Sequence, residues 1–208
     1  MKKVFLFIIL LIPIVVAGIF FVGYEEDEMK FYKQLNETDT VISAVVNDPT
    51  QSMSSVISSL QQRFEDLVEI GITFTEDQDI SENFDQFNQA LEKSNQLVQQ
   101  LTKLFEQESI TNLEKLNEQA PDTMKEIVKQ EQTRINQLKD TSTVINQINT
   151  HLATMNTVFY SNKNNEVFNY INTAREYFNQ IKEEYTKYSQ SVTEYMKQKS
   201  DLYSQIKS

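Results

Sequence analysis

The chain has 208 residues, a formal net charge of −11, three glycines, three prolines and no cysteine. A surface this acidic repels nucleic acid and anionic lipid headgroups, and the lack of cysteine excludes disulfides, thiolate zinc sites and a cysteine nucleophile. A sheet protein of this length needs many tight turns, which favour Gly and Pro, so the composition predicts an all-α fold.

An uninterrupted apolar run, residues 4–22, follows Lys2 and Lys3 near the N-terminus. Its length is close to the roughly 20 residues that cross a bilayer. We therefore expect a membrane anchor over residues 1–24, a cytoplasmic N-terminus and an extracytoplasmic domain over residues 25–208. The alternative is a signal peptide cleaved after Ala17, which would release a secreted protein.

Two apolar stripes at helical spacing occupy residues 26–70, and Asp48-Pro49 lies between them. Asp48 suits a helix N-cap and Pro49 a first helical position. The pattern leaves open whether this segment is one kinked helix or two. Gly71 is the predicted end of its second half.

The next two predicted helical segments, 81–120 and 122–160, begin at Ser81 and after Ala120-Pro121. Both carry apolar residues at the alternating three- and four-residue spacing of a packed helix. Polar residues interrupt these seams at Ser94, Glu131, Ser142, Asn149 and Asn156.

The last segment, residues 165–207, carries the longest seam in the chain. It holds more than five heptads of a/d positions, and Lys199 is the one charged residue among them. These positions are Val167, Ile171, Ala174, Phe178, Ile181, Tyr185, Tyr188, Val192, Tyr195, Lys199, Leu202 and Ile206.

Four long segments with short connections predict antiparallel neighbours. We expect an elongated up-down four-helix bundle or antiparallel coiled coil, roughly 60 Å long at about 1.5 Å per residue. A spectrin-like three-helix bundle with the first segment apart from it is the alternative. Coiled-coil seams of this kind also allow a homo-oligomer.

No constellation of residues in the sequence predicts catalysis. His151 is the single histidine, and no Glu precedes it at the three-residue spacing of a di-metal bundle. The acidic runs 25–28 and 183–184 are adjacent residues that point in different directions on a helix. We therefore predict no catalytic, cofactor-binding or metal-binding residues, and a protein that is not an enzyme.

Tyrosine is concentrated in the last segment, where seven of the nine lie between positions 160 and 203. An aromatic stripe at helical spacing predicts a wide core face. Tyrosine also offers large amphipathic contact area, so residues at the edge of the seam are candidates for a strip that binds glycan or protein. These candidates are Tyr170, Tyr177 and Tyr203.

The residues 165–169, Asn-Glu-Val-Phe-Asn, continue with Thr173, Tyr177, Asn179, Lys182 and Tyr185. This piece resembles the Asn/Phe/Tyr/Lys-rich last helix of the cell-wall-binding lipoproteins of Gram-positive bacteria, and it covers about a fifth of the chain. The resemblance implies a helical, extracytoplasmic protein associated with the cell wall. The chain departs from that family because it lacks the lipidated cysteine.

The expected function is binding. We expect a membrane-anchored, extracytoplasmic helical interaction or scaffold protein of the bacterial cell envelope, with a protein or cell-wall partner. The alternative is a ligand-sensing helical ectodomain that works with a partner chain.

Overall fold

The computed structural model describes residues 27–73, 81–159 and 164–207, which form helices and short connections with no β-strand among them. The all-α prediction is therefore confirmed for this part of the chain. The helices are α1 (Asp27–Val46), α2 (Met53–Thr73), α3 (Ser81–Phe105), α4 (Glu108–Thr111), α5 (Leu113–Gln119), α6 (Asp122–Phe159) and α7 (Asn164–Lys207).

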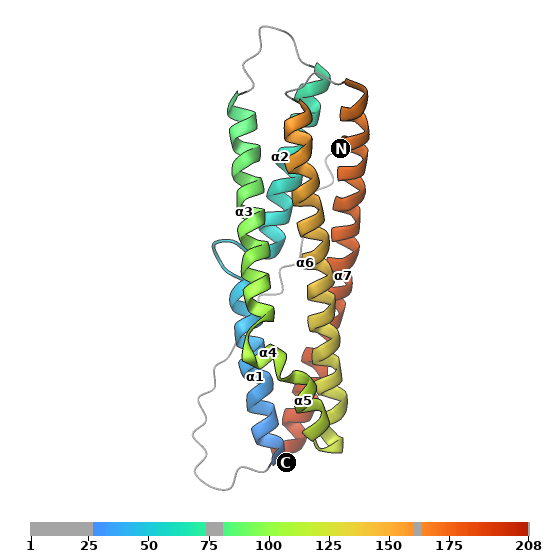
Figure 1. The fold of residues 1–208 in the computed structure, drawn as a ribbon. Helices are drawn as coiled ribbons and strands as arrows, with labels where there is room; N and C mark the ends of the chain where they lie inside the picture. Colours follow the sequence, from blue (N-terminus) through green and yellow to red (C-terminus); the bar gives the residue numbers. More distant parts are fainter. Residues whose placement is uncertain (1–26, 74–80, 160–163, 208) are drawn as a thin grey trace.

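The long helices form an elongated bundle of four columns (Figure 1). α1 and α2 follow one another along the first column, and α3, α6 and α7 are the other three. The start of α1 and the end of α7 lie at the same end as α5, while α2 and α6 end, and α3 and α7 begin, at the other end. The predicted four-column arrangement is thus present, and the three-helix alternative is wrong because α1 and α2 share the core of the others.

The first predicted segment is two helices, separated by residues 47–52. Asp48 does not cap a helix that starts at Pro49, because its carboxylate closes a local turn. Asp48 Oδ1 accepts hydrogen bonds from the backbone N–H and the hydroxyl of Thr50, at 2.7 and 2.5 Å. Ser52 caps α2 instead, since its Oγ accepts from the Ser55 N–H at 3.3 Å.

Two other predicted boundaries differ from the structure. α2 continues through Gly71 to Thr73, so Gly71 is not its terminating residue. The segment 81–120 is not one helix, because Gln107 adopts an extended backbone and α4 and α5 then turn across the end of the bundle. The seam weakens at this point in the sequence, and burial of Ile110 and Leu113 holds the turned chain in place. The boundary at Ala120-Pro121 is confirmed, with Ala120 extended and α6 starting at Asp122.

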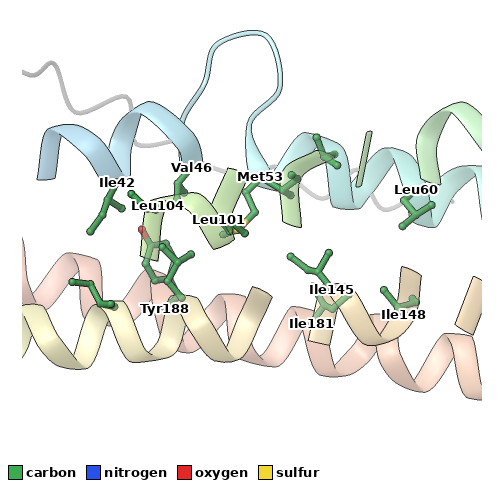
Figure 2. Close-up of a cluster of buried hydrophobic side chains, with 14 of the residues drawn as sticks. Ile42, Val46, Met53, Leu60, Leu101, Leu104, Ile145, Ile148, Ile181 and Tyr188 are labelled. Atoms are coloured by element: carbon green, nitrogen blue, oxygen red, sulfur yellow. The ribbon is translucent and has the colours of Figure 1, made fainter. Parts of the chain in front are cut away.

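The core lies along the bundle axis and receives side chains from every column. Figure 2 shows core side chains following one another along the axis: Ile42 lies near Leu104 and Tyr188, and Ile145 and Ile181 lie together further along the bundle. Most predicted seam positions of α7 for which burial is described are fully buried, and Val167, Tyr185 and Val192 are partly buried. Each fully buried aliphatic side chain contributes about 1.5–3 kcal/mol relative to exposure, which is the main force that joins the columns.

The predicted anchor, residues 1–24, lies outside the described residues. Among the helices that the structure describes, none has both the length and the hydropathy that a bilayer crossing requires.

Candidate functional site

Five polar side chains from three helices meet inside the bundle, in what we call the ionic cluster: Asp39 of α1, Glu131 and Arg134 of α6, and Tyr195 and Lys199 of α7. The a/d seams bring Glu131, Tyr195 and Lys199 inward, since all three occupy positions in the apolar series. Arg134 lies one turn after Glu131, and Asp39 lies on the inward side of α1 between Leu35 and Ile42.

Arg134 and Lys199 share the carboxylate of Asp39. Arg134 Nη2 donates to Asp39 Oδ1 and to Glu131 Oε1, each at 2.5 Å. Lys199 Nζ donates to Asp39 Oδ2, and Tyr195 Oη donates to the same oxygen at 3.3 Å. The guanidinium of Arg134 also lies 4.5 Å from the centre of the Tyr195 ring, a cation–π distance. With both acids ionised, two carboxylates balance two cations.

Burial governs the electrostatics of the cluster. The Glu131 side chain is 0% exposed and that of Arg134 is 5% exposed. Burial raises the pKa of Glu131 to about 7, even though Arg134 favours its ionised form, and the negative charge of Asp39 raises it further. The pKa of Arg134 is raised above its ordinary value, because Glu131 and Asp39 outweigh the opposing effect of burial. Burial likewise raises the pKa values of Tyr188 and Tyr195.

Several polar atoms on this face of α6 have no hydrogen-bond partner within the described part of the chain. They are Glu131 Oε2, Arg134 Nε and Gln137 Oε1. Glu131 and Arg134 are shielded from solvent, and a carboxylate oxygen without a hydrogen-bond partner can take up a proton when the pKa of its group is raised. The arrangement therefore suits proton binding and the pairing of α1 with α6 and α7.

A second polar contact crosses the core between α3 and α6. Ser94 Oγ donates to Asn149 Oδ1 at 2.8 Å, and both residues are buried. These are two of the polar interruptions that the sequence shows in its seams. Here an interruption on one helix is matched by an interruption on its neighbour.

The three tyrosines of the predicted binding strip lie in two separate places. Tyr170 and Tyr177 are partly buried against His151 of α6, with ring centres 5.0 and 5.7 Å from the imidazole. Tyr203 lies near the other end of α7, 5.2 Å from the ring of Tyr32. The three residues do not form one continuous surface, and whether either place binds a partner stays a prediction.

His151 has a structural contact in this arrangement. Its Nε2 lies 2.8 Å from the backbone oxygen of Tyr170, which links α6 to the start of α7. Within residues 27–73, 81–159 and 164–207, no group of three or more His, Cys, Asp or Glu side chains has a geometry that could hold a metal ion.

An open groove of about 390 Å³ runs between α3 and α6. Val98 and Phe105 are its apolar members, and Lys139, Ser142 and Asn146 line the opposite side. It is shallow and mixed in polarity, and its shape favours no particular ligand.

Sequence analysis identified some members of the ionic cluster and missed others. Lys199 and Glu131 are visible as charged residues in apolar seams. Asp39 and Arg134 fall outside the a/d series and look like ordinary surface charges. The one available signal for Arg134 is its three-residue spacing from Glu131, which places the two side chains on one helix face.

Comparison of this chain with protein-family models, curated proteins and solved structures finds no match.

Proposed function

We propose that this protein is a membrane-anchored, extracytoplasmic helical scaffold of the cell envelope, which holds a binding surface at a fixed distance from the membrane. The observation that carries the proposal is the placement of the start of α1. Asp27 begins α1 at one end of the bundle, close in sequence to the apolar run 4–22.

The dimensions of the bundle support a spacer. α7 has 44 residues, and a helix of that length spans about 66 Å at 1.5 Å per residue. With the chain anchored ahead of Asp27, the end of α2 and the starts of α3 and α7 would lie at the far end of the rod. The acidic composition is compatible with a solvated surface that is repelled by anionic headgroups.

A surface at the far end offers a contact for a protein or cell-wall partner. Phe168, near the start of α7, is 60% exposed and is a large apolar side chain open to solvent. Tyr170 and Tyr177 lie close to it in sequence on the same helix. Aromatic side chains of this kind suit both glycan and protein partners.

The absence of cysteine from the chain permits a direct topology test. Ser59 is exposed on α2, so a Ser59→Cys variant should react with a membrane-impermeant maleimide on intact cells. It should remain in the membrane fraction after a carbonate wash. The cysteine-free parent is the matched control for background labelling.

Three measurements separate an anchored scaffold from a cytoplasmic domain, a secreted protein and a sensor. Labelling only after lysis would place the domain in the cytoplasm and end the proposal. Release into the medium with a new N-terminus at Gly18 would show a cleaved signal peptide. Photo-crosslinking from position 168 then distinguishes a scaffold bound to wall or envelope proteins from a sensor that is paired with one signalling chain.

A further inference from the structure

α1 is a separate unit of the bundle. Residues 47–52 interrupt the helix between Val46 and Met53 and project away from the other columns. α1 contacts α3, α4, α6 and α7, and it buries one apolar stripe in the bundle: Phe31, Leu35, Ile42 and Val46. Its one acidic residue in the core is Asp39, which lies in the ionic cluster.

We propose that α1 is a proton-linked latch, which docks on α6 and α7 together with uptake of one proton by the ionic cluster and loosens when that proton leaves. The inference is independent of membrane attachment, because it concerns only the packing of α1 within the bundle.

Glu131 is the group that takes the proton. The charged groups that act on it are Asp39 from α1, Arg134 from its own helix and Lys199 from α7. The buried phenols of Tyr188 and Tyr195, also on α7, lie close enough to be affected by its charge. Its Oε2 has no partner within the described residues, so protonation there breaks no contact that the structure shows.

Docking of α1 supplies the influences that favour the protonated form. Asp39 brings a negative charge beside Glu131, and α1 helps to exclude water from the cluster. Departure of α1 would remove that charge and admit water, while Arg134 and Lys199 would remain on α6 and α7. The pKa of Glu131 would then fall. By reciprocity, a proton on Glu131 must favour the docked state by the same factor.

The direction of the pH effect follows from this linkage. The pKa of Glu131 is raised to about 7 in the docked state, so docking is favoured below that value and weakened as the pH rises through it. With an undocked pKa near the ordinary glutamate value, the docking constant should fall by up to about tenfold between pH 6 and pH 8.

Paired spin labels on the full-length chain measure docking directly. Glu37 on α1 and Ser200 on α7 are both exposed, so a Glu37→Cys/Ser200→Cys variant reports the distance between the two helices. Asn136→Cys/Ser200→Cys reports the distance between α6 and α7 and is the control pair. We expect the α1–α7 distance distribution to broaden from pH 6 to pH 8 while the control pair stays unchanged.

Two substitutions on α6 then test the assigned group. Glu131→Gln removes the titrating proton and should abolish the pH response of the α1–α7 pair. Glu126→Gln changes an exposed acid on the same helix and should leave the response intact. The proposal is overturned by an unchanged distribution in the parent, by broadening that persists in Glu131→Gln, or by equal broadening of the control pair.

If Glu131→Gln does not fold, the proposal can still be tested on the chain without substitution at position 131. The ¹³C shift of the Glu131 carboxyl in the unsubstituted chain should titrate near pH 7. A midpoint among those of the exposed glutamates would overturn the proposal.

Discussion

Removal of Arg134 should be one of the most damaging single changes to this fold. In Arg134→Met, Lys199 is the one cation left to Asp39 and Glu131, so the cluster must either carry an excess negative charge or protonate Glu131. Breaking a buried ion pair from one side typically costs about 3–5 kcal/mol. The lost cation–π contact with Tyr195 adds to this cost.

The pH dependence of that cost has a defined sign. Without Arg134, the pKa of Glu131 should rise further, because the strongest charge favouring its ionised form is gone. Glu131 is then protonated over a wider pH range, so the destabilisation by Arg134→Met should be larger at pH 8 than at pH 6.

A compensated double variant isolates the electrostatic contribution. Arg134→Met combined with Glu131→Leu removes one charge of each sign and leaves Asp39 paired with Lys199. Replacing a buried ion pair by apolar groups is often neutral or stabilising by about 1–4 kcal/mol, so the double variant should be at least close to the parent. Urea unfolding of residues 25–208, monitored by circular dichroism, gives the stability of the parent, of each single variant and of the double variant, which together form a double-mutant cycle. A loss of less than about 1 kcal/mol in the unfolding free energy of Arg134→Met would refute the reasoning. The same holds if the double variant is as unstable as Arg134→Met alone.

Three further predictions concern the remainder of the core and the tyrosine edge. Ile181→Ala should cost about 2–5 kcal/mol in the same unfolding assay, because it truncates a buried seam residue. Changing Tyr170 and Tyr177 together to Ser should lower the free energy of unfolding by less than Ile181→Ala does, since both tyrosines are partly buried at the edge. The same double change should weaken pull-down of wall fragments or envelope proteins. A loss of stability as large as that of Ile181→Ala would instead assign both tyrosines to the core. Asn149→Ala should lower the free energy of unfolding by about 1–3 kcal/mol, because it leaves the Ser94 hydroxyl without its acceptor. Adding Ser94→Ala should recover part of that loss. No recovery would show that the contact contributes little.

The columns of this fold were predictable because their sequence signal is long and repetitive. The α7 seam persists over many turns without Gly or Pro, and no alternative period fits it. The boundaries that depended on one side chain were less predictable. Asp48 is an acceptable N-cap in isolation, but two hydrogen bonds from Thr50 use its carboxylate in a turn.

The ionic cluster shows where single-helix reasoning stops. A charged residue in an apolar seam, such as Lys199, indicates that a buried partner is needed, because an unpaired buried charge is too costly. The sequence does not identify that partner, since the carboxylate comes from α1, 160 residues away along the chain. Asp39 could be recognised only once the relative register of α1, α6 and α7 was known.

Mechanical tension gives the ionic cluster a further role. A pull on the chain ahead of Asp27, with the far end of the bundle held, would drag α1 lengthwise along its neighbours. A slip of one heptad, about 10 Å, would move Leu35, Ile42 and Val46 out of their buried positions. Residues 47–52 provide the slack for that slip, with a contour of up to about 20 Å. A slip would also separate Asp39 from both Arg134 and Lys199, so the ionic cluster would resist such a pull together with the apolar stripe of α1.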